Sequence, residues 1–112
     1  AAFVRAVNID DDNATAYNWL GILYRQARDY GRAEDAYRNA LKADGDFGLA
    51  HLNLGILYDE YLRRPADALP HYKEYLKHGG QDDLRVQAWI AAIENPNPGS
   101  GAKPTSGSVE KP

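Results

Sequence analysis

The 112-residue sequence contains no cysteine and no methionine. The missing thiols exclude disulfides, thiolate metal sites and cysteine nucleophiles. Hydroxyl nucleophiles are almost absent as well, because residues 1–94 contain no serine and a single threonine, Thr15. The sequence therefore argues against an enzyme that works through a covalent intermediate.

Positive charge is neither abundant nor clustered. The chain has 13 Lys and Arg against 16 Asp and Glu, a formal net charge of −3. A surface that follows nucleic-acid phosphates needs concentrated basic residues, so no nucleic-acid partner is expected. Long apolar runs are missing too. No segment approaches the roughly 18 uninterrupted apolar residues of a membrane span, so direct membrane insertion is not expected.

An internal repeat is the strongest positive signal in the sequence. One five-residue stretch returns 34 positions later, as Leu20-Gly21-Ile22-Leu23-Tyr24 and Leu54-Gly55-Ile56-Leu57-Tyr58. Further along, Ala33 and Tyr37 correspond to Ala68 and Tyr72, where the offset is 35. The change of offset predicts one inserted residue in the intervening loop, near residues 62–64.

Within each repeat the apolar spacing predicts two helices. One face is made by Tyr17, Leu20, Gly21, Tyr24 and Ala27, and a second face by Ala33, Tyr37, Ala40 and Leu41. Steps of three and four residues place such side chains on one side of a helix. The mid-helix glycines cost about 1 kcal/mol of helix propensity. They are therefore expected where another helix crosses at close range.

Helix-start signals agree with this division. Asn13 is expected to cap the first helix, Asp29 lies at the turn before the second, and Pro65 lies just inside the corresponding helix of the next repeat. Pro70 interrupts that same helix, so a bend or a loosened first turn is expected there.

The pattern resembles the tetratricopeptide repeat family, whose unit reads W-x₂-L-G-x₂-Y, then A-x₃-F, then P. The matching residues are Tyr17 in place of Trp, Leu20, Gly21, Tyr24, Ala33 and Tyr37, and in the second copy His51 in place of Trp, Leu54, Gly55, Tyr58, Ala68 and Tyr72. Gly45 and Gly80 stand in place of the closing proline. The resemblance implies an all-α, right-handed solenoid of helical hairpins.

The expected organisation has five parts. They are the second helix of a truncated upstream repeat (1–13), a first repeat (14–47), a second repeat with the inserted loop residue (48–82), a capping helix (83–94) and a disordered tail (95–112). The tail holds four of the six prolines and all three serines. The capping helix follows from the apolar face of Val86, Trp89, Ile90 and Ile93, since a repeat array needs a cover for its last unit.

The resemblance also implies a concave groove lined by the first helix of each repeat. The residues expected to point into it are Thr15, Asn18, Ile22, Arg25, Gln26, Leu49, Leu52, Ile56, Asp59 and Glu60. Leu49, Leu52 and Ile56 are interpreted as surplus to the core, and exposed apolar area of this kind is typical of a binding surface. The tail, an upstream part of a longer protein or a second copy of the chain are alternative covers for it.

Two functions follow from this reading. The first is a protein-interaction or scaffold module that binds an apolar helix or an extended peptide in the groove. The alternative is self-assembly through an open N-terminal face, with a weak homo-dimer formed by Phe3, Val4 and Val7. The groove lacks the basic set that holds terminal carboxylates in some family members, so acidic tails are not the expected client.

No catalytic, cofactor-binding or metal-binding residues are predicted. His71 and His78 are seven residues apart, roughly 10 Å along a helix, too far for one ion. His51 is expected to pack with its polar edge outward, and residues 10–13, three aspartates and an asparagine, are interpreted as helix-capping residues rather than a calcium loop. Asp67 and His71 form a carboxylate-histidine spacing that no hydroxyl or thiol completes.

Overall fold

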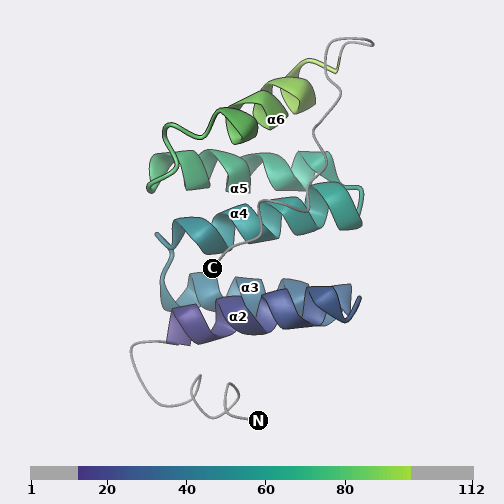
Figure 1. Ribbon diagram of the computed structural model, residues 1–112, viewed down its shortest axis with the longest axis vertical. Helices are drawn as coiled ribbons and strands as arrows, with labels where there is room; N and C mark the ends of the chain where they lie inside the picture. Colours follow the sequence, from purple (N-terminus) through teal and green to yellow (C-terminus); the bar gives the residue numbers. More distant parts are fainter. Residues whose placement is uncertain (1–12, 97–112) are drawn as a thin grey trace.

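Residues 13–96 are described by this computed structural model. Within that range the helices are α2 (Asn13–Gln26), α3 (Tyr30–Ala43), α4 (Gly48–Ile56), α5 (Pro65–Lys77) and α6 (Leu84–Glu94), and a π-helical segment, η1 (Leu57–Tyr61), continues α4. They follow one another along the long axis of the molecule (Figure 1). The described range contains no strand, which confirms the all-α prediction. The expected helix in residues 1–13 and the tail of residues 95–112 fall almost entirely outside it.

Two helical hairpins, α2–α3 and α4–α5, repeat the same construction. The turn of each contains an arginine in the left-handed region, Arg28 with φ 64° and Arg63 with φ 57°. A left-handed backbone is uncommon for residues other than glycine, so its return at the equivalent place marks a shared turn geometry. The predicted unit of two helices is therefore present twice.

The inserted residue lies in a helical turn and not in the loop. In the first hairpin Ala27 N–H donates to the carbonyl of Leu23, a four-residue step, whereas in the second Leu62 N–H donates to Leu57, a five-residue step of 2.9 Å. One extra residue in a helix is accommodated as a π-turn. The expectation of an insertion near residues 62–64 is corrected accordingly, because widening the turn η1 preserves the hydrogen bonds that a longer loop would lose.

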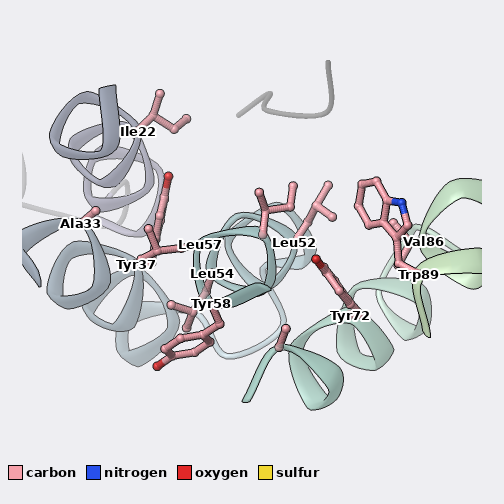
Figure 2. Packing of buried hydrophobic residues seen from close by; sticks show 12 residues of the cluster. Ile22, Ala33, Tyr37, Leu52, Leu54, Leu57, Tyr58, Tyr72, Val86 and Trp89 are labelled. Carbon is pink, nitrogen blue, oxygen red and sulfur yellow. The ribbon is translucent and has the colours of Figure 1, made fainter. Parts of the chain in front are cut away.

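The glycines predicted at helix crossings face tyrosine rings. A Cβ added to Gly21 would overlap the ring of Tyr37, and one added to Gly55 would lie 2.7 Å from Tyr72 Cδ1. Both tyrosines are buried, at 1% and 0% exposure. Each hairpin therefore closes by seating a ring from its second helix against the bare backbone of its first (Figure 2).

The last hairpin is covered by α6. Asp83 caps this helix, accepting hydrogen bonds from the backbone N–H groups of Arg85 and Val86. Val86 and Trp89 are buried, and the Trp89 ring packs against Tyr72 with ring centroids 5.5 Å apart. Since these residues extend the apolar cluster of the hairpins, α6 covers the face that the array would otherwise expose to water.

The remaining helix-end predictions have different outcomes. Asp29 lies at the turn before α3, as predicted, where it also caps the helix by accepting from Arg32 N–H, and α5 begins at Pro65, as predicted. Asn13 is the first described residue of α2, and its Oδ1 accepts no hydrogen bond within residues 13–96, so the expected side-chain cap is not formed there. The first turn of α5 stays hydrogen-bonded and the helix continues through Pro70, because the carbonyl deprived of a donor belongs to Ala66, which is exposed to water.

The glycine–tyrosine packing predicts a strong dependence on position. Gly21→Ala and Gly55→Ala should each lower the free energy of unfolding by about 1 to 3 kcal/mol, because the buried ring opposite cannot move aside. Gly31→Ala is the matched control, since a Cβ there meets nothing within 4 Å. It should leave stability unchanged or raise it by up to about 1 kcal/mol. Urea denaturation measures the free energy of unfolding of the three variants. Equal stabilities would contradict the close packing of the tyrosine rings against Gly21 and Gly55.

Candidate functional site

The ten residues predicted to line the groove come from α2, α4 and η1. Figure 2 shows Ile22 of α2, Leu52 of α4 and Trp89 of α6 directed to the same side of the row of helices. Hereafter the ten residues are called the inner-face set: Thr15, Asn18, Ile22, Arg25, Gln26, Leu49, Leu52, Ile56, Asp59 and Glu60. Trp89 was not in the predicted set, and it extends the apolar row to the end of the array.

Burial divides the inner-face set. Thr15 and Gln26 are exposed, Arg25, Leu49, Asp59 and Glu60 are partly buried, and Asn18, Ile22, Leu52 and Ile56 are buried. Leu52 and Ile56 are only 2% and 1% exposed, so the expectation that they are surplus to the core is wrong. They belong to the same apolar cluster as Trp89. The reason is that α4 is the central helix of the array and is buried on every side, from Ala50 to Ile56.

Asn18 holds the two hairpins together. Its Oδ1 accepts a hydrogen bond of 3.0 Å from Nδ2 of Asn53, and the two side chains are 0% and 2% exposed. The bond joins α2 to α4, the first helices of consecutive repeats. A buried amide pair of this kind fixes the register of one helix against the other.

Two charged members of the inner-face set also bind within the chain. Arg25 Nη1 donates to Tyr61 Oη at 3.1 Å, and its guanidinium lies 5.3 Å from the centre of the Tyr61 ring. Tyr72 Oη donates to Asp59 Oδ2 at 3.0 Å. Burial and the neighbouring Asp59 carboxylate raise the pKa of Tyr72. Its hydroxyl therefore stays protonated, and the π-turn links α2 on one side to α5 on the other.

A second apolar surface lies on the outward side of α2. Four of its residues have counterparts 34 positions later in α4 and η1, in the pairs Tyr17 and His51, Leu20 and Leu54, Leu23 and Leu57, and Tyr24 and Tyr58. The counterparts are all buried, whereas none of the four on α2 is, and Leu23 is 45% exposed. A cavity of about 300 Å³ lies beside Tyr17, Leu20 and Tyr24. We call these four residues of α2 the open face.

The second hairpin shows which contact covers the counterpart of the open face, a contact that Tyr24 does not make within residues 13–96. Tyr58 Oη donates to Glu34 Oε2 at 2.7 Å and accepts from Arg38 Nη2 at 2.5 Å. Burial, followed by the hydrogen bond to Glu34, raises the pKa of Tyr58 to about 12. The α3 helix thus covers the tyrosine with a carboxylate and a guanidinium one turn apart. Tyr24 occupies the equivalent place on α2.

Two of the three histidines meet inside the second hairpin. His51 Nδ1 lies 3.1 Å from His71 Nδ1, and His51 Nε2 lies 2.9 Å from the carbonyl oxygen of Gly45. The nitrogens are much closer than the ring centres, which are 5.3 Å apart, so the rings meet through their edges. His51 is 8% exposed. The prediction that its polar edge faces outward is therefore wrong, since both nitrogens are used inside the chain.

The other candidates for chemistry contact charged side chains nearby. His78 lies 3.3 Å from Glu74 and 3.5 Å from Asp46, and Asp67 pairs with Arg64 at 2.7 Å. Residues 13–96 contain no group of three or more side chains that could hold a metal ion. Within the same residues no helix is long and apolar enough to cross a membrane. The acidic residues 10–12 lie outside the described range.

Sequence reasoning missed the roles of Tyr61 and of the His51–His71 pair. The change of offset from 34 to 35 was a signal for Tyr61, because an extra residue inside a helix turns the following side chains to new directions. For the histidines the signal was weaker. His51 stands at the position of a large buried aromatic residue in the family pattern, and such a place leaves a polar ring in need of an internal partner.

The burial of Leu52 on the inner face predicts that this leucine belongs to the core. Leu52→Ala should lower the free energy of unfolding by about 2 to 5 kcal/mol, because it leaves a cavity in a fully packed cluster. Leu84→Ala is the matched control, since Leu84 is 74% exposed, and it should change stability by less than about 0.5 kcal/mol. Urea denaturation of both variants measures the two changes in the free energy of unfolding. Equal effects would mean that Leu52 is not a core residue.

The comparisons with known proteins agree with this geometry. The family model described as tetratricopeptide repeat matches residues 1–46 and 20–82. The chain is also 32% identical over 69 residues to the Protein O-mannosyl-transferase Tmtc3 of Drosophila melanogaster. That stretch is 62% of this chain and 7% of the relative, so the chain spans a small part of that protein. No solved structure matches the chain.

The family match extends over both hairpins and over residues 1–12, which is well over half of the sequence. It coincides with the features that carry the repeat: the left-handed turns at Arg28 and Arg63 and the glycines seated against Tyr37 and Tyr72. The chain is therefore a member of the tetratricopeptide repeat family.

Proposed function

We propose that this chain is a protein-interaction module whose inner face receives an apolar helix or an extended peptide. Tetratricopeptide repeats generally mediate protein–protein interactions, and the family match supports that class of function. The relative is named as a transferase, but the match covers only 7% of that protein. The activity in its name is therefore stated of the relative alone. The finer assignment to the inner face depends on the arrangement of side chains.

The observation that carries the proposal is the apolar row on the inner side of successive helix pairs. Ile22, Leu52 and Trp89 follow one another on that side (Figure 2). These side chains are only 5%, 2% and 1% exposed, so this strip belongs to the core and forms the floor of the inner face. A partner segment laid along this strip would contact the accessible residues that border it.

The accessible edge of this strip consists of polar and half-buried residues. Thr15 and Gln26 are exposed at the two ends of α2, and Leu49 is half-buried near the start of α4. A partner would meet these side chains first and would approach the row from them. Thr15 and Gln26 are also the residues that can be changed without opening the core, in contrast to Leu52 and Ile56.

The experiment uses peptides selected from a displayed library of random sequences, with binding measured by fluorescence anisotropy. Thr15→Arg with Gln26→Arg should weaken binding at least tenfold, because two bulky charges narrow the approach to the strip. Lys42→Glu is the matched control, an exposed residue that lines a cavity beside α3. Helical circular dichroism should be unchanged in both proteins.

Each outcome of that measurement bears on the proposal. Selected peptides that lose affinity only with the α2 variants support the inner face as the binding surface. Peptides that bind the Thr15→Arg, Gln26→Arg protein as tightly as the unmodified chain, and lose affinity with Lys42→Glu, move the binding surface to the outer side and contradict the proposal.

We propose as a second candidate self-assembly through the open face of α2. Leu23 is 45% exposed and the adjacent Trp19 is 37% exposed, whereas Leu57, the counterpart of Leu23, is fully buried. Residues 20–22, which lie between Trp19 and Leu23, carry no charge. Two copies of the chain could therefore place this side of α2 face to face without charge repulsion. The dimer predicted earlier through Phe3, Val4 and Val7 concerns residues outside the described range.

Sedimentation tests the second candidate. The unmodified chain should show concentration-dependent dimers, and Leu23→Glu should shift it to monomer by placing two carboxylates in the contact. Leu84→Glu on α6 is the matched control, because Leu84 is also an exposed leucine, and it should leave the dimer intact. A chain that stays monomeric at millimolar concentration rejects self-assembly through this face.

A further inference from the structure

The His51–His71 contact joins three parts of the molecule. His51 belongs to α4, His71 belongs to α5, and Gly45 lies in the turn that leads from α3 into α4. The three are connected through one imidazole, since His51 reaches His71 with Nδ1 and the Gly45 carbonyl with Nε2. The pair therefore lies at the junction between the first hairpin and the second.

The hydrogen-bond partners determine where the protons are. A carbonyl oxygen only accepts, so His51 Nε2 must carry the hydrogen toward Gly45. In a neutral His51 the other nitrogen, Nδ1, then carries none and accepts. The facing Nδ1 of His71 must in turn be the donor. One proton therefore occupies the space between the two facing nitrogens.

A second proton cannot fit between the same atoms. If both facing nitrogens carry hydrogen, two donors meet at 3.1 Å and the hydrogen bond is lost. If both rings are charged, two positive charges also repel each other in a partly buried place. The contact is thus compatible with a neutral pair or with one positive charge, and is incompatible with two.

We propose that His51 and His71 form a pH-sensitive clamp, which holds the two hairpins at their junction while the pair carries at most one extra proton and opens when both rings become charged. The clamp is independent of the proposed partner-binding function. Because His51 also holds Gly45, opening acts on the connection between the hairpins and not only on the contact between α4 and α5.

The surroundings of His71 disfavour its charged form. Burial lowers the pKa of His71 to about 4, with further lowering by His51 and by the positive charge of Arg38 on α3, while Glu74 and Asp67 on α5 act in the opposite direction. The Tyr58 ring packs against it with centroids 5.8 Å apart. The cavity beside His71 is also lined by Asp35 and Lys42 of α3, which carry opposite charges.

The direction of the pH effect follows from linkage. An unfolded histidine has a pKa of about 6.5, so between pH 6.5 and 4 the unfolded chain binds a proton at His71 that the folded chain excludes. Stability therefore rises with pH through this window. The contribution of the clamp is complete above about pH 6.5 and is lost as the pH falls toward 4.

Three variants test the clamp. His71→Asn retains a donor near the place of Nδ1 but cannot be charged. His51→Gln keeps a donor for Gly45 and removes the like charge beside His71. His78→Asn is the matched control, because His78 contacts Glu74 and Asp46 rather than another histidine. Each is compared with the unmodified chain by urea denaturation at pH 7.5 and pH 4.5.

The clamp predicts that acidification weakens the unmodified chain and His78→Asn more than His71→Asn. The difference should be roughly 10- to 100-fold in the unfolding equilibrium constant. In a nuclear magnetic resonance titration His71 should change charge well below pH 6, and His51→Gln should raise its midpoint. A midpoint near 6.5 in the unmodified chain, or an equal acid response of His71→Asn, would overturn the proposal.

Discussion

The whole array depends on a tyrosine ring seated against a glycine backbone. In each hairpin the second helix presents a buried ring, Tyr37 or Tyr72, at the place where the first helix has no Cβ, at Gly21 or Gly55. This contact sets the distance between the two helices, and that distance determines which other side chains meet. Trp89 of α6 then packs on the ring of Tyr72 and joins the last helix to the same core.

From that packing follow two surfaces with different properties. The inner face carries an apolar row closely joined to the core, and its charged members, Arg25 and Asp59, are bound to tyrosines within the chain. The open face of α2 has the residues of a packed interface without the burial of its counterpart on α4. The first surface is the one we propose for partner binding, and the second is the one we propose for self-assembly.

Much of the hairpin packing could be predicted from the sequence because the repeat occurs twice. Gly21 and Gly55 return at a fixed offset, and the alternation of three and four residues defines both helices of each hairpin. The burial of Leu52 and Ile56 could not be predicted in the same way. The periodicity assigns one buried side to a helix, whereas α4 is central and is buried on all sides. Burial of that kind depends on helices far apart in the sequence.

Two further features could not be predicted from the sequence, again for physical reasons. The change of offset predicts an inserted residue near residues 62–64 but does not show which element accommodates it, and the structure accommodates it as the π-turn that directs Tyr61 toward Arg25. The pairing of His51 with His71 depends on a distance between two helices. No spacing along the chain encodes it until the register of the hairpin is known.

The most direct test of the account is a double-mutant cycle between Gly55 and Tyr72. If the ring sets the helix distance, Tyr72→Leu should relieve most of the added cost of Gly55→Ala, because the smaller side chain leaves room for the new Cβ. The interaction free energy from urea denaturation should then be about 1 to 3 kcal/mol. Additive effects, with an interaction near zero, would contradict the claim that this contact determines the hairpin.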